Sequence, residues 1–234
     1  MTTSELFQNI PVQRSPRRRR IAVSVAPDGE VVIHAPSFAT TGQIALAWSK
    51  LGAWAARKQT LLARHPEARP HSFRFAPGGT FFYLGRELPL VLRPAPPGAL
   101  TIRPGENELQ TASADPAAIA QGMEAFYRRQ TRRIVTAQVE CFAPRFGIGV
   151  RSISINGARR RFGSCNAAGD LNFSWRLAMY PEQLIELVVL HELTHRLHLD
   201  HSPAFYAALA QFLPDHRERE RELRLWSRKL SAYK

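Results

Sequence analysis

Hydrophobic residues recur along this chain with two periods, one typical of strands and the other of helices. Residues 21–25 and 31–33 are β-prone runs, and the Pro27-Asp28-Gly29 turn between them predicts a hairpin. Apolar residues at helical spacing follow Thr40 and Thr41, either of which can cap a helix. The N-terminal part of the chain therefore predicts a strand hairpin followed by a long helix.

The rest of the chain alternates between short strands and longer helices. Residues 73–110 contain β-prone runs separated by turns, which predict several antiparallel strands in a small sheet. Asp115-Pro116 begins a long helix, residues 150–157 alternate as a strand, and residues 160–175 predict a second hairpin. Three further helices are predicted to begin at Pro181, Ser202-Pro203 and Pro214-Asp215. This order predicts an α+β fold.

The chain is strongly basic. Its 234 residues carry a formal net charge of +13 and are 44% hydrophobic, enough for one domain or one domain with a small appendage. A cationic field of this size attracts polyanions such as nucleic acid or nucleotides, although an Arg-, Ala- and Pro-rich composition is also what a GC-rich genome produces. On the long helix, arginines three and four apart form one stripe that favours a solvated outer face over a binding site: Arg128, Arg129, Arg132 and Arg133.

The sequence carries no signal for a membrane or for secretion. No stretch approaches eighteen uncharged apolar residues, so we expect no transmembrane helix and no membrane partner. The N-terminus lacks a basic region followed by an apolar one, which argues against a signal peptide. Two cysteines, Cys141 and Cys165, cannot form a disulfide framework, so we expect a reducing, cytoplasmic setting.

The string His191-Glu192-Leu193-Thr194-His195 is the most informative motif in the chain. Side chains four apart on a helix lie on the same face, so His191 and His195 can offer two imidazole nitrogens to one metal ion. Glu192 lies one residue around the turn, where it can reach a water bound to that ion. Two histidine ligands beside a non-ligating glutamate are typical of zinc hydrolases, in which the glutamate accepts the proton of the water.

A catalytic zinc ion needs a third protein ligand, and His198 and His201 are the nearby candidates. On a straight helix His198 would lie about 10 Å beyond His191, too far to share one ion. The Ser202-Pro203 pair ends one helix and begins another, so the chain can break near Asp200 and turn His201 back to the ion. We choose His201 as the third ligand. Asp200 is a weaker candidate for orienting a ligand imidazole, and Cys165 is expected to be a small buried residue rather than a ligand.

Several ordered motifs surround this string. They are Arg161-Phe162-Gly163-Ser164-Cys165, the stretch from Gly169 to Leu177, His201-Ser202-Pro203-Ala204-Phe205 and Phe212-Leu213-Pro214-Asp215. The first half adds Arg18-Arg19-Arg20-Ile21, Pro27-Asp28-Gly29, Ala35-Pro36 and Tyr83-Leu84-Gly85-Arg86. With these motifs, nearly the whole chain resembles the YgjP-like family of bacterial zincin-type metallopeptidases, which are related to the SprT and WLM proteases.

This resemblance implies one zinc ion held by His191, His195 and His201, with Glu192 as the catalytic acid and base. The order of elements along the chain predicts a flexible arm at 1–16, a β-rich region at 17–112 and a zincin-like metallopeptidase region at 113–234, the last two packed as one compact unit. The chain departs from the family at Phe162, where tryptophan is usual, and at Ser174, where asparagine is frequent. Both lie on the hairpin before the metal helix and bear on substrate preference.

We therefore interpret the chain as a zinc-dependent metallopeptidase that acts on a peptide or protein. An exposed strand near the metal can pair with an extended substrate, and the candidate substrate-binding residues are Arg161, Phe162, Gly163, Ser164 and Tyr206. Two alternatives remain. The arginines could serve a metal-dependent nucleoside-triphosphate pyrophosphohydrolase, although no phosphate-binding glycine loop is present. They could also serve a nucleic-acid-associated protease or binding module, although no recognition motif is present.

Overall fold

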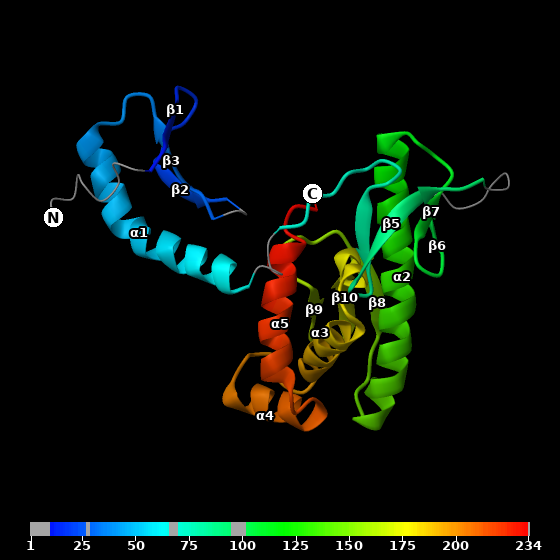
Figure 1. Cartoon of the computed structure of the whole chain (residues 1–234). Helices are drawn as coiled ribbons and strands as arrows, with labels where there is room; N and C mark the ends of the chain where they lie inside the picture. Colours follow the sequence, from blue (N-terminus) through cyan, green and yellow to red (C-terminus); the bar gives the residue numbers. More distant parts are fainter. Residues whose placement is uncertain (1–9, 27–28, 66–69, 95–101, 234) are drawn as a thin grey trace. The chain divides into compact units, whose positions relative to one another are not determined.

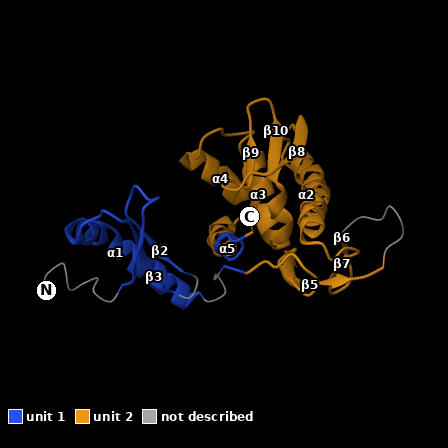
Figure 2. Cartoon of the chain, turned by 90° about the horizontal axis from the view of Figure 1, so that it is seen from above, with its two compact units in different colours: residues 1–71, 227–232, 234 blue, residues 72–226, 233 orange. Residues whose placement is uncertain are grey.

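The protein is described by a computed structural model, which covers residues 10–26, 29–65, 70–94 and 102–233 (Figure 1). The chain forms two compact units (Figure 2). Unit 1 comprises residues 1–71, 227–232 and 234, and unit 2 comprises residues 72–226 and 233. The fold class is α+β, as predicted.

The division between the units differs from the predicted grouping of residues 17–112. Residues 17–71 lie in unit 1, whereas residues 72–112 lie in unit 2 with the predicted metal-site region. The contacts of Phe82 explain this. Phe82 is buried, and its carbonyl accepts a 2.7 Å hydrogen bond from the buried Tyr127 hydroxyl. Hydrogen bonds and apolar contacts across the core therefore join residues 72–112 to the second half of the chain.

Unit 1 is a three-stranded sheet with one helix. Its elements are β1 (Val12–Ser15), β2 (Ala22–Val25), β3 (Val31–Pro36) and α1 (Thr41–Arg64). The strand order is β1-β3-β2, and β2 pairs with β3 antiparallel as the hairpin pattern predicts. In the predicted turn, Gly29 has a φ of +93°, a conformation that favours glycine, while Pro27 and Asp28 lie outside the described residues. Thr40 caps α1 through a reciprocal pair of hydrogen bonds with Gln43.

The predicted flexible arm is wrong for residues 12–15. These residues form β1, which pairs in parallel with β3, with Val12 opposite Ile33. The backbone of Ile33 donates to the Pro11 carbonyl at 2.9 Å, and Ile10 and Val12 pack against the buried Ile33 cluster. Sheet pairing and apolar burial therefore order this segment. Residues 1–9 of the predicted arm lie outside the described residues.

Unit 2 is built around one long helix. Its N-terminal strands are β4 (Thr80–Tyr83), β5 (Arg86–Leu92), β6 (Ile102–Pro104) and β7 (Leu109–Thr111). The following elements are α2 (Pro116–Arg145), β8 (Ser152–Asn156), β9 (Gly163–Cys165), β10 (Asp170–Ser174), a short 3-10 helix η3 (Trp175–Met179), α3 (Glu182–Thr194), α4 (Pro203–Phe212) and α5 (His216–Lys229). Asp115 caps α2 by accepting a 2.8 Å hydrogen bond from the Ala118 backbone.

The sheet at residues 80–111 is not wholly antiparallel, which corrects the prediction. The strand order is β4-β5-β7-β6, and β5 pairs with β7 in parallel. The other two pairings, β4 with β5 and β6 with β7, are antiparallel as expected. The β6–β7 hairpin presents its second strand to β5, and that strand buries Leu109 and Thr111. Alternation of residue types reveals a strand but does not specify which neighbour it joins.

The second hairpin forms where the sequence predicts it. β9 and β10 are antiparallel, and Gly169 in the connecting turn has a φ of +92°. β8 pairs in parallel with the other edge of β10. The strand order is therefore β8-β10-β9, and β9 lies at an edge of the sheet. β9 lies beside α3, and this contact brings the hairpin to the histidine helix.

Two arginines of the α2 stripe, Arg128 and Arg132, hold a neighbouring strand through hydrogen bonds. Arg128 donates to the Ile155 carbonyl at 3.2 Å, and Arg132 donates to the Ile153 carbonyl at 3.3 Å. Both acceptors belong to β8, which is an edge strand. These guanidinium groups therefore bind the backbone of the edge strand to α2. The stripe is thus more than a solvated face.

Among the described residues, no helix is both long enough and apolar enough to cross a bilayer.

Candidate metal centre

The histidine motif lies at the C-terminal end of a buried helix. α3 buries most of its side chains, including Leu190, Leu193 and Thr194, so the position of the helix is fixed by the core. The helix ends at Thr194, and His195 is its C-cap. The predicted break near Asp200 is therefore too late in the chain. The chain leaves the helix in a tighter turn, in which the Arg196 backbone donates to the Leu193 carbonyl and the Leu197 backbone to the Thr194 carbonyl, both at 2.9 Å.

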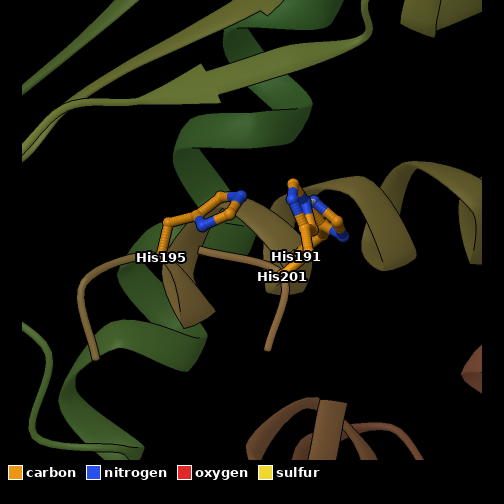
Figure 3. A group of neighbouring side chains, drawn as sticks. All are labelled: His191, His195 and His201. Carbon is orange, nitrogen blue, oxygen red and sulfur yellow. Dashed lines mark hydrogen bonds between the residues drawn. The ribbon is translucent and has the colours of Figure 1, made fainter. Parts of the chain in front are cut away.

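Three imidazoles converge at this turn. Figure 3 shows the side chains of His191, His195 and His201 facing one another. One nitrogen from each ring lies within 4.8 Å of the others, and the Nε2 atoms of His191 and His201 are 3.0 Å apart. Nitrogens that share a zinc ion at about 2.0–2.1 Å in a tetrahedron are separated by about 3.3 Å. The structure thus brings together the three residues predicted as ligands, at spacings that suit one ion.

A backbone carbonyl fixes the orientation of His195. The Nδ1 atom of His195 lies 3.1 Å from the His198 carbonyl oxygen. A carbonyl can only accept, so Nδ1 carries the hydrogen and Nε2 keeps its lone pair for a metal. Asp200, the sequence candidate for this role, instead accepts a 3.3 Å hydrogen bond from the Ser202 backbone. Sequence reasoning could not find the His198 carbonyl, because every residue has one.

A buried phenylalanine supports all three rings. Phe205, the third residue of α4, is fully buried, and its ring centroid lies 4.7–5.0 Å from the centroids of His191, His195 and His201. Ser202 caps α4 by accepting a 3.4 Å hydrogen bond from the Phe205 backbone. The cap and Pro203 define the start of α4, and this places His201 just before the helix, within reach of α3.

The electrostatics of the site favour the neutral imidazoles of His191 and His195. Burial, together with the neighbouring His195 and His201, lowers the pKa of His191 to about 4. Burial also lowers the pKa of His195. A neutral imidazole is the form that binds a metal, so these donors are available at neutral pH.

Glu192 is buried beside the cluster. The residue is 5% exposed, and its Oε2 atom has no hydrogen-bond partner among the described residues. Burial raises the pKa of Glu192 to about 8, and the positive charge of Arg161 opposes this rise. A buried carboxyl oxygen without a partner is costly and therefore implies a missing neighbour. A metal ion with a bound water supplies such a neighbour, so the residues present fit a catalytic metal.

The family assignment agrees with this geometry. A family model described as YgjP-like, metallopeptidase domain, matches residues 19–225 of the chain. The chain belongs to the YgjP-like family. No curated protein gives a significant sequence match. The family match indicates a metallopeptidase domain, so we interpret the three histidines as candidate metal ligands.

In this YgjP-like chain, Gly163 makes room for Glu192. A Cβ atom on Gly163 would lie 2.6 Å from Glu192 Oε1 and 2.8 Å from Glu192 Cδ. Cβ atoms essentially never make contacts so short, so the carboxyl group packs directly on the backbone of β9. Sequence analysis places Gly163 among the substrate-binding candidates. The structure gives it a further role, which is to let the carboxyl group lie beside the histidines.

Replacement of Gly163 by alanine is expected to displace the Glu192 carboxyl group. A shift of about 1 Å in a catalytic group can reduce turnover by about 100-fold. Zinc content should be unchanged, because the nearest atoms that a Cβ on Gly163 would meet all belong to Glu192. Turnover, bound zinc and thermal stability measured together test this expectation. Gly149→Ala is the matched control, since a Cβ atom there meets nothing within 4 Å. Equal turnover in the two variants would contradict the role of Gly163.

A cavity of about 280 Å³ adjoins the motif in the YgjP-like structure. It is lined by Arg161, Phe162, Gly163, Leu187, Val188, His191, Glu192, Glu220 and Leu223. Three of the predicted substrate-binding residues are thus beside Glu192. Ser164 is not in this lining and pairs with Asn172 of β10. Tyr206 lies on α4 with its ring centroid 6.3 Å from that of His201, and it lines a different cavity.

Sequence reasoning also missed the anchor of the turn after α3. Arg196 donates to the Gly149 carbonyl at 3.0 Å and to the Ala167 carbonyl at 2.6 Å. Ala167 belongs to the β9–β10 turn, so this side chain ties the histidine turn to the hairpin. Cys165 is partly buried on β9, and the metal-compatible cluster found among the described residues does not include it.

Proposed function

We propose that this protein is a zinc-dependent metallopeptidase of the YgjP-like family. The observation that carries the proposal is the cluster of His191, His195 and His201 beside the buried, unpartnered carboxyl group of Glu192. Three imidazoles leave one tetrahedral position open, which is typical of catalytic rather than structural zinc sites. The domain family supports a metal-dependent peptidase, and zinc and the individual roles of the residues are our assignment.

The three histidines would hold the ion, and Glu192 would move the proton. Zinc bound there would lower the pKa of a water to about 7 and polarise the substrate carbonyl. Glu192 would accept a proton from the attacking water and deliver it to the leaving amide nitrogen. Burial suits the carboxyl group to this task, because it raises the pKa of Glu192 to about 8, which is close to neutral pH. The His198 carbonyl keeps His195 in the tautomer that the ion requires.

The substrate in this proposal is an extended peptide lying along β9. This strand is at the edge of its sheet, and its residue Gly163 lies directly against the Glu192 carboxyl group. Edge strands bind extended peptides through backbone hydrogen bonds. Arg161 and Phe162 come just before the strand and line the neighbouring cavity, where they would contact substrate side chains. Tyr206 is a candidate donor to the oxyanion.

Removal of the metal is expected to abolish peptide cleavage. Zinc-loaded full-length protein should cleave casein or members of a peptide library, EDTA should reduce the rate to background, and added zinc should restore it. Elemental analysis of protein purified without added metal identifies the native ion, because imidazole donors also suit cobalt, nickel and copper. Phosphate release from nucleoside triphosphates, followed with malachite green, is the control. Metal-dependent phosphate release without peptide cleavage would contradict a peptidase.

A further inference from the structure

A second cavity lies beside α4 and α5, close to the metal centre. Its volume is about 350 Å³, and it is lined by Tyr206, His216, Arg217, Glu220, Arg221 and Arg224. Two features connect it with the centre. Glu220 lines both this cavity and the one that contains Glu192 and His191. Tyr206 packs near His201, with 6.3 Å between the ring centroids. A peptide bound at the metal centre therefore passes close to this basic cavity.

The cavity has an excess of uncommitted positive charge. Arg217, Arg221 and Arg224 are exposed and recur at helical spacing on one face of α5. None of the three makes a hydrogen bond or ion pair with a residue that the structure describes. Arg219, on another face of the same helix, pairs with Asp215 at 2.8 Å and with Glu186 at 2.9 Å. Three cations face one anion, Glu220, in this lining, so the cavity favours a negatively charged ligand.

A buried histidine in the wall lacks, within the described part of the chain, a partner for one of its ring nitrogens. His216 is 4% exposed, and its Nε2 atom has no partner among the described residues. Its Nδ1 atom lies 3.1 Å from the Leu213 carbonyl oxygen, so Nδ1 is the donor of that pair. The ring of Tyr206 stacks on it, with 6.3 Å between centroids. With Nδ1 as the donor, Nε2 is an acceptor whose partner is missing from the residues that the structure describes.

We propose that the cavity formed by Tyr206, His216, Arg217, Arg221 and Arg224 binds a carboxylate of the peptide substrate. The inference rests on the proposed peptidase function and specifies its substrate class as acidic peptides. Arginine suits this role because its planar guanidinium group can donate two parallel hydrogen bonds to one carboxylate. The carboxylate comes either from the C-terminus of the peptide or from an aspartate or glutamate side chain, and a direct comparison separates the two sources.

Binding to an inactive, zinc-loaded Glu192→Gln protein tests the inference without cleavage. The probes are fluorescein-labelled hexapeptides of alanine and leucine that end in a carboxylate or an amide, and a second pair that carries glutamate or glutamine internally. We expect at least one carboxylate form to bind about 10-fold more tightly than its neutral partner at low ionic strength. A preference in the first pair identifies a C-terminal carboxylate, and one in the second pair identifies a side chain. Equal affinities within both pairs would overturn the inference.

Substitutions in the lining test whether the carboxylate preference arises in this cavity. Arg217→Ala and Arg221→Ala should each reduce the preference for the carboxylate form, while Glu220→Gln should increase it because it removes the one anion of the lining. Arg145→Ala, which removes an exposed arginine at the C-terminal end of α2, is the matched control and should change nothing. A preference that survives both arginine substitutions would overturn the site.

The binding assay also separates this inference from the proposed function. Arginine-dependent binding of acidic peptides, together with no cleavage of any peptide by the protein that retains Glu192, would contradict the peptidase and leave the carboxylate site in place. Cleavage without a preference for carboxylates would support the peptidase and overturn the carboxylate site. A nucleoside triphosphate that binds more tightly than every peptide, through the same arginines, would overturn the assignment to peptides.

Discussion

Glu192→Gln is expected to abolish turnover while zinc remains bound. The amide has nearly the same shape as the carboxyl group, so the buried packing against Gly163 should persist. It cannot accept a proton from a water at the metal and pass it to the leaving nitrogen. General acid–base catalysis contributes about 10²- to 10⁴-fold, and we expect a loss of that size in kcat. Zinc content should stay at one ion per chain, because the three histidines remain in place.

The measurements for this variant are kcat on a cleaved peptide and zinc by elemental analysis. Glu186→Gln is a useful comparison, because Glu186 lies on the same helix and pairs with Arg219 rather than facing the histidines. We expect that protein to keep its activity. Turnover in Glu192→Gln close to that of the unmodified protein would remove Glu192 from the mechanism. Loss of zinc in Glu192→Gln would instead make Glu192 part of the metal site.

His201→Ala is expected to lose most of the metal affinity. Four-ligand zinc sites gain about 10–16 kcal/mol on binding, so one ligand accounts for roughly 10²- to 10³-fold in affinity. His201 reaches the site from the loop before α4, and its removal should not unfold the protein, because its side chain is exposed. Competition with a chromogenic zinc chelator measures the affinity, and circular dichroism verifies the fold.

His198→Ala is the matched control for this variant. His198 lies in the same turn, and the site uses its backbone carbonyl, which alanine retains. We therefore expect this protein to bind zinc with nearly unchanged affinity. If His198→Ala lost zinc and His201→Ala kept it, the assignment of the third ligand would be reversed.

Local sequence was enough to find the elements around the metal centre. Helical spacing places His191 and His195 on one face, Ser202-Pro203 signals the start of α4, and Gly169 marks the hairpin turn. These signals act over a few residues, because caps, turns and helical faces depend on near neighbours. The α+β class and the two hairpins followed from the same short-range patterns.

Contacts between distant segments decided the rest. The end of α3 at Thr194, the His198 carbonyl behind His195 and the close approach of Gly163 to Glu192 all depend on how segments pack together. The same holds for β1 in the sheet of unit 1 and for the parallel pairing of β5 with β7. The sequence by itself determined which chemical groups this protein has and which of them share a helix. Only the tertiary structure decided which backbone groups and cavities surround them, because burial and hydrogen bonding are properties of the packed chain.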